Sequence, residues 1–134
     1  MQSRDGAIQR PPGEFAGGNA APVLDPFVIG QLRTIGGNCA FFHRVLDLSS
    51  SHLPSAVNKI ENLRHSSDLA AMADAAHALK SMCANIGARR ATAACHDLEH
   101  AARTGEAFDA GGKIGAIASE MLSVIAEIER LRAA

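Results

Sequence analysis

The strongest constraint on the fold is a run of apolar residues at helical spacing. Steps of 3, 4, 3, 4 and 3 residues separate Leu69, Met72, Ala76, Leu79, Cys83 and Ile86. Residues three and four apart share one face of an α-helix, so the run predicts a helix over about 68–86 that packs against other helices. Ser67 is its expected cap, and Gly87 suits the left-handed residue that ends a helix.

Four further segments have helical signals. We expect helices over about 26–35, 39–65, 89–104 and 110–132. Their ends carry cap or stop residues, which are Asp25, Asn38, Gly105 and Asp109. Pro54 lies inside the second of them and should kink it, because proline removes a backbone hydrogen bond.

The inner faces of these segments are apolar. In segment 39–65 they are Leu46, Leu53, Ala56, Ile60 and Leu63. In segment 89–104 they are Ala91, Cys95, Leu98 and Ala102, and in segment 110–132 they are Ile114, Ile117, Met121, Val124, Ile128 and Leu131. Hydrophobic residues make up 47% of the chain and aromatic residues only 4%, which favours closely packed helices. The predicted fold is all-α, an antiparallel up-down four-helix bundle with a short extra N-terminal helix as a lid.

The first 22 residues differ from the rest. They lack periodicity and contain paired prolines and paired glycines, so we expect a disordered arm over 1–22 and one bundle domain over 23–134. No signal peptide and no membrane-length apolar run is visible, which favours a cytoplasmic protein. A net charge of -1 gives no indication of nucleic-acid binding. The three cysteines form no C-x-x-C pair and are expected to be reduced core residues.

His77 stands out because it lies just past the seam residue Ala76. Successive helical residues are rotated by 100°, so its imidazole should be partly exposed at the border of the packed face. Lys80 and Ser81 share its face one turn further on. Neutral imidazole is a competent nucleophile near pH 7, which makes His77 the candidate reactive group.

The segment from His77 to Ala88, HALKSMCANIGA, resembles the phosphorylation motif of histidine-phosphotransfer (HPt) domains, roughly H-x-L-K-G-[SA]-[SA]-x-x-x-G-A. The segment CHDLE, residues 95–99, is similar to the next helix of that family. Leu53-Pro54, in the expected second helix, is similar to the corresponding position of the family. The resemblance covers about residues 24–132. Ser81 departs from the family's usual glycine, and its hydroxyl is placed to bond either the imidazole or a phosphoryl group.

The resemblance implies a phosphorelay intermediate. Nε2 of His77 would take a phosphoryl group from a receiver-domain aspartate and pass it to another, with Lys80 stabilising the transferred charge. The partners would be a response regulator, a hybrid histidine kinase or both, and the Mg²⁺ would belong to the receiver. No glycine-rich phosphate loop is visible, so we expect no autokinase activity and no cofactor in this chain. Nothing demands more than a monomer.

The expected docking face centres on His77. Ala73, Asp74 and Ala84 lie one to two turns away on the same helix. Ala73, Ala84 and Ser81 are small and allow a partner helix to approach, and Asp74 is a surface carboxylate that would repel wrong acidic partners. The facing side of the second helix should complete the surface.

Two other functions remain open. An HPt-like bundle that docks and inhibits a kinase or receiver without accepting phosphate would have the same surface. Residues 96–100, HDLEH, match H-x-x-E-H and put His96 and His100 on one face, so a metal-binding bundle is the third hypothesis. A chance match is the better account of a protease motif in so small a bundle.

Overall fold

The computed structural model describes residues 21–37, 39–105 and 107–134, and throughout that part of the chain the regular structure is helical. The elements are α1 (Pro26–Thr34), the short 3₁₀ turn η2 (Ile35–Gly37), α2 (Ala40–Glu61), α3 (Leu69–Asn85), α4 (Arg89–Thr104) and α5 (Ala110–Ala133). The all-α prediction is confirmed, and the five predicted helices are present with boundaries shifted by a few residues at most.

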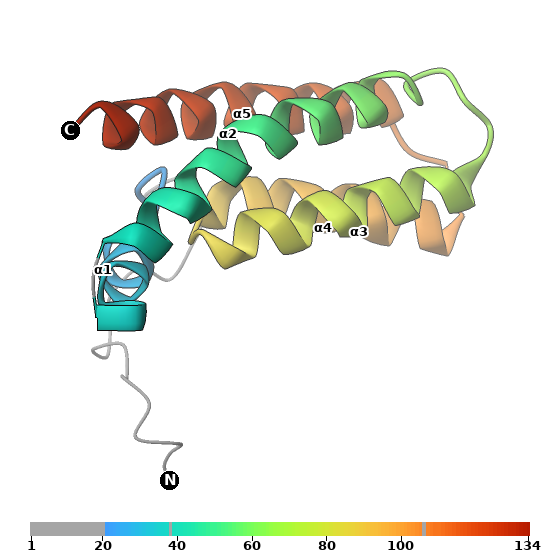
Figure 1. Cartoon of the computed structure of the whole chain (residues 1–134). Coiled ribbons are helices and arrows are strands. Elements are labelled where there is room, and N and C mark those ends of the chain that lie inside the picture. Colours follow the sequence, from blue (N-terminus) through green and yellow to red (C-terminus); the bar gives the residue numbers. More distant parts are fainter. Residues whose placement is uncertain (1–20, 38, 106) are drawn as a thin grey trace, which may run out of the picture.

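The four long helices lie side by side and α1 covers one end (Figure 1). α2 packs against α3 and α5, and α4 packs against the same two helices. α1 packs against α2. Helix α2 continues through Pro54, and its ribbon changes direction along its length in Figure 1. Each long helix therefore has two neighbours, which encloses a single core between them.

The core is formed by the apolar faces that the periodicity predicted. Every predicted seam residue of α4 and α5 is buried, as are five of the six in the α3 segment. Leu69, Ala56 and Leu63 pack against this core while staying partly exposed. Burial of such continuous stripes is the main driving force for association of these helices.

Several local predictions need correction. Asp68, not Ser67, caps α3: its carboxylate accepts a hydrogen bond from the backbone N–H of Ala71 at 3.0 Å. Asp68 is the cap because its side chain reaches the N3 amide of a helix that begins one residue later than expected. Cys39 is exposed, because it lies at the N-cap of α2 before the buried stripe begins. Asn38 lies outside the described residues. Cys83 and Cys95 are buried and free, as expected.

α1 is tied to the turn between α3 and α4. The buried Asp25 caps α1 by accepting from the Phe27 amide at 2.9 Å, and its Oδ2 lies 3.3 Å from the Arg89 guanidinium. Its own backbone N–H donates to the carbonyl of Gly87 at 2.8 Å. Gly87 has φ +76°, and a Cβ there would lie 2.8 Å from Cβ of Val28. Glycine at this turn therefore permits both the left-handed backbone and the close approach of α1.

The predicted arm lies outside the described residues except for its last two. Ala21 is buried, and its carbonyl accepts a hydrogen bond from Arg90 at 3.3 Å, so packing begins shortly before the predicted domain start at 23. In the part of the chain that the structure describes, no helix is both long and apolar enough to cross a bilayer.

Candidate functional site

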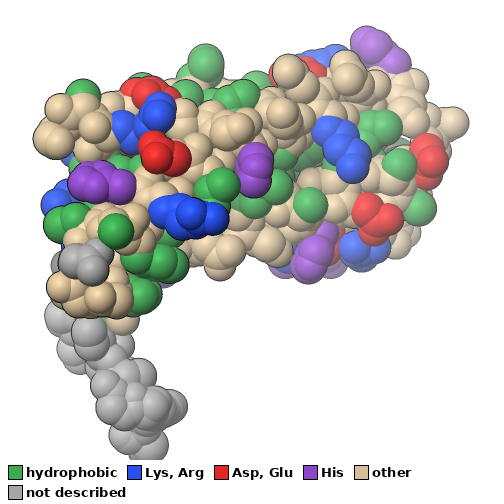
Figure 2. Space-filling model, in the orientation of Figure 1, with side chains coloured by type: hydrophobic (Ala, Val, Ile, Leu, Met, Phe, Trp, Pro, Cys, Tyr) green, Lys and Arg blue, Asp and Glu red, His purple; other side chains and the backbone are tan. Residues whose placement is uncertain are grey.

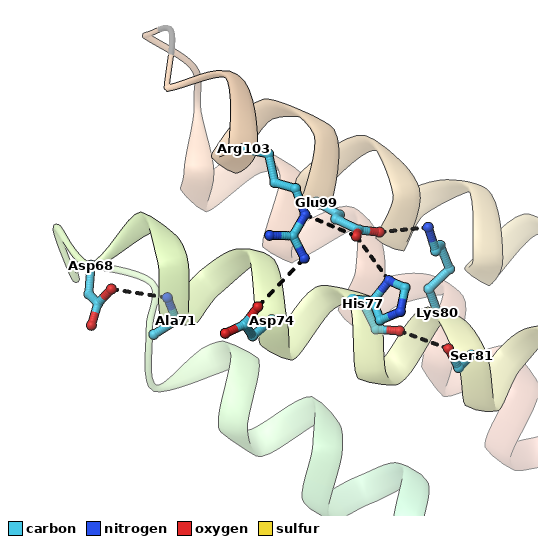
Figure 3. Close-up of polar contacts among 8 residues, drawn as sticks. All are labelled: Asp68, Ala71, Asp74, His77, Lys80, Ser81, Glu99 and Arg103. Carbon is cyan, nitrogen blue, oxygen red and sulfur yellow. Dashed lines mark hydrogen bonds and ion pairs between the residues drawn. The ribbon is translucent and has the colours of Figure 1, made fainter.

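His77 projects from the middle of α3 toward solvent, and its side chain is 56% exposed. Its neighbour Ala76 is fully buried, so the imidazole lies at the edge of the packed face as the spacing predicted. Nδ1 of His77 lies 2.9 Å from Oε2 of Glu99 on α4 (Figure 3). One nitrogen of the ring is therefore fixed by the neighbouring helix.

Glu99 is the centre of the polar cluster and is only 11% exposed. Nζ of Lys80 lies 2.6 Å from its Oε1, and Nε of Arg103 lies 3.2 Å from its Oε2. The close ion pair with Lys80, and then the contacts with Arg103 and His77, outweigh burial and lower the pKa of Glu99 to about 2. The carboxylate is thus ionised at neutral pH and acts only as an acceptor.

This charge state fixes the tautomer of His77. An ionised carboxylate has no proton to give, so Nδ1 must donate to Oε2. In the neutral ring the lone pair is then on Nε2. Among the described residues none forms a hydrogen bond to Nε2, so this nitrogen is open to solvent.

The predicted helpers of His77 have different partners from those expected. The Lys80 ammonium pairs with Glu99, which places it beside the imidazole and ties it to the carboxylate. The Ser81 hydroxyl donates to the backbone carbonyl of His77 at 3.2 Å. It bonds neither ring nitrogen, since a serine on a helix reaches the carbonyl one turn before it.

The residues predicted for the partner face differ in their exposure. Ala84 and Asp74 are exposed, and Oδ1 of Asp74 lies 3.5 Å from a guanidinium nitrogen of Arg103. Ala73 is buried, at 1% exposure, and is not available to a partner. Ala73 lies where α3 packs against α4, and together with Ala102 it lines a small pocket between the two helices.

Glu99 and Arg103 were not predicted as site residues. Two signals in the sequence pointed to them: Glu99 ends the segment that resembles the second family helix, and Arg103 follows it by four residues, the spacing of a helical ion pair. Their meeting with His77 depends on how α3 and α4 are aligned, which periodicity alone does not give.

An apolar groove of about 360 Å³ lies where α1, α2 and α3 meet. It is lined by Leu32, Phe41, Val45, Leu48, Ser49, His52, Leu53, Met82, Asn85 and Ile86. Phe41 and Leu48 are 40% and 45% exposed, and hydrophobic side chains are visible at the surface of the α1 end in Figure 2. Met82 and Asn85 line the groove from α3. At 3.6 residues per turn they lie about 140° and about 80° round the helix from His77, so the groove lies beside the face that carries the imidazole.

The two arginines that begin α4 have structural partners. Arg89 pairs with Asp25, and Nε of Arg90 lies 3.0 Å from Oε1 of Glu120. No group of three or more ligating side chains suited to a metal ion occurs in residues 21–37, 39–105 and 107–134.

This helical fold, with an exposed histidine held by a carboxylate across two helices, defines a class of small helical domains that present an imidazole to solvent. Residues 44–134 match the Hpt domain family, and the chain belongs to that family. Its members are phosphocarriers of phosphorelays that interact with receiver domains.

Two solved structures have the same fold. Histidine-containing phosphotransfer protein B from Pseudomonas aeruginosa PAO1 superposes with a TM-score of 0.77 at 24% identity, over 85% of this chain and 97% of that one. A putative histidine-containing phosphotransfer protein from rice superposes with a TM-score of 0.66 at 15% identity, over 84% and 85%. A comparison with curated protein sequences gives no match.

Proposed function

We propose that this protein accepts a phosphoryl group on Nε2 of His77 from a receiver-domain aspartate and passes it to the aspartate of another receiver. The observation that carries the proposal is the orientation of the imidazole, with Nδ1 held by Glu99 and Nε2 open to solvent. The antiparallel up-down four-helix bundle supplies the rigid support, since both residues lie in the middle of long helices.

The transfer step follows from this geometry. The Nε2 lone pair attacks phosphorus, the new N–P bond forms as the bond from phosphorus to the aspartyl oxygen breaks, and the aspartate leaves as a carboxylate. The ring becomes positively charged. Its Nδ1–H continues to donate a hydrogen bond to Oε2 of Glu99, and the carboxylate stabilises the charge on the ring. Transfer to the next receiver is the same step in reverse.

Lys80 supports the step in two ways. Its ammonium holds the Glu99 carboxylate in place at 2.6 Å. It also follows His77 by one turn on α3, so its positive charge lies near the imidazole and stabilises the negative charge of the phosphoryl oxygens as they approach. The Mg²⁺ for this chemistry comes from the receiver, and the chain does not phosphorylate itself.

The receiver docks on the exposed side of α3 and extends into the groove toward α1 and α2. Ser81 and Ala84 are small and exposed, which allows a helix of the partner to approach the imidazole. Phe41 and Leu48 give that helix apolar surface to cover. The free protein acts as a cytoplasmic monomer.

The test is phosphotransfer from a phosphorylated receiver. We expect label on the wild-type protein in an acid-labile, base-stable form, and none on His77→Gln. The control His65→Gln removes another exposed histidine and should be labelled normally. Transfer to His77→Gln would refute the assignment. Binding of the receiver without any label on the wild-type protein would favour the inhibitory interaction module instead.

A further inference from the structure

His96 and His100 form a second pair of imidazoles, on the outer face of α4. Both side chains are exposed. Their ring centroids are 6.2 Å apart, and the planes differ by only 20°. Among the described residues neither ring forms a hydrogen bond or an ion pair, so both have nitrogen atoms facing solvent.

We propose that His96 and His100 bind one divalent late first-row transition-metal cation, Cu²⁺ or Zn²⁺, between their rings. Imidazole nitrogen is a preferred ligand for both ions. Residues four apart on a helix have Cβ atoms about 5–6 Å apart, which lets two rings tilt toward one cation at metal–nitrogen distances of about 2.0–2.1 Å.

The neighbourhood favours this site. No existing bond of either ring has to break, so binding costs only the ordering of two exposed side chains. Asp97, next to His96, adds negative charge to the same turn of α4, and the guanidinium of Arg103, three residues after His100, is paired with Asp74 and Glu99.

The site has two protein ligands, because no third ligating group joins them in the described residues. Water fills the remaining coordination positions, so the site exchanges its metal readily and differs from a closed structural zinc site. The order of affinities for such ligands places Cu²⁺ above Zn²⁺, and hard Mg²⁺ has no affinity for it.

The site is separate from the phosphotransfer centre. Neither ring touches His77, Lys80 or Glu99, and the proposal does not depend on the phosphorelay function. His77→Gln should therefore bind the metal as the wild type does, which separates failure of this proposal from failure of the other.

The test is titration of the intact protein with CuCl₂ or ZnCl₂ in a buffer that does not chelate. We expect one saturable site, tighter for Cu²⁺, and no heat with MgCl₂. Single variants His96→Ala and His100→Ala should each lose at least about tenfold in affinity, because one imidazole replaces a chelate of two. His65→Ala, which removes an exposed histidine with no second imidazole one turn away, should bind like the wild type.

Thermal unfolding gives a second readout. Helix α4 brings the two rings together only in the folded chain, so the metal should raise Tm of the wild type and of His65→Ala and leave Tm of both pair variants unchanged. Undiminished affinity in either pair variant, or no saturable binding by the wild type up to millimolar metal, would overturn the proposal.

Discussion

His77 and Glu99 are 22 residues apart in sequence and are joined across two helices by a 2.9 Å contact between Nδ1 and Oε2. The imidazole is mostly exposed, whereas the carboxylate is nearly buried. The buried group thus sets the orientation and tautomer of the exposed one.

Replacing Glu99 should slow phosphotransfer, and Glu99→Ala should be slower than Glu99→Gln. The side-chain amide introduced by Glu99→Gln can still accept from Nδ1 but carries no charge, whereas Glu99→Ala has neither acceptor nor charge. A hydrogen bond to a charged group is worth about 1.5–3 kcal/mol, so Glu99→Ala should lose about 10- to 100-fold in transfer rate. Rates of label transfer from a phosphorylated receiver measure this. Equal rates in the wild type and in Glu99→Ala would show that the carboxylate has no positioning role.

Acid should weaken the contribution of Glu99 to stability. Its pKa is lowered from 4.5 to about 2 by Lys80, Arg103 and His77. Because the folded pKa lies below the unfolded one, the stabilisation is complete above about pH 4.5 and is lost as the pH falls toward 2. Urea unfolding at several pH values should show the gap between the wild type and Glu99→Gln narrowing through that window. A gap that stays constant from pH 6 to pH 2.5 would contradict the linkage.

Lys80→Ala should slow transfer without abolishing it. The variant removes the cation nearest to Glu99 and leaves the Arg103 contact. A partly exposed ion pair contributes up to about 1 kcal/mol, which corresponds to a loss of about fivefold in rate. The control is Lys59→Ala, which removes an exposed lysine of α2. An unchanged rate in Lys80→Ala would show that this lysine is incidental.

Binding of the receiver to the apolar groove can be tested by placing a charged side chain in it. Leu48→Asp places a carboxylate on an exposed groove position and should raise the Kd for the receiver by about tenfold, with little effect on Tm. Leu122→Asp is the matched control, because Leu122 is 74% exposed on α5 and does not line the groove. Equal losses in both variants would mean that the groove does not hold the partner.

Gly87→Ala should destabilise the fold more than Gly105→Ala. The two glycines have φ of +76° and +72°, so each substitution strains the backbone by about 1–2 kcal/mol. At Gly105 a Cβ meets nothing within 4 Å, whereas at Gly87 it meets Val28 and Asp25. We expect the extra loss to be about 1 kcal/mol or more in urea unfolding. Equal destabilisation would show that α1 is not held closely at this turn.

The sequence predicted the helices well because each is defined by local signals. The stripe of α5 and the caps at Asp25 and Asp109 depend only on neighbours along the chain, and they are present as predicted. The start of α3 was predicted less well, because Ser67 and Asp68 are adjacent and both are residue types that cap helices.

Contacts between helices were harder to predict. The exposure of His77 followed from its place beside Ala76, but the Glu99 contact depends on the alignment of α3 with α4. The burial of Ala73 has the same origin, since the closeness of α4 decides whether so small a side chain reaches solvent. Whether His77 carries the phosphoryl group stays a prediction until transfer is measured.

The anchor at Asp25 has a consequence for where the folding unit begins. The Hpt domain match starts at residue 44, yet the α3–α4 turn is covered by a helix that ends ten residues earlier. A fragment cut at the limit of the match would leave Arg89 without its carboxylate and uncover the apolar surface around Ile86. The smallest fragment that preserves this packing must retain the chain from Ala21 onward.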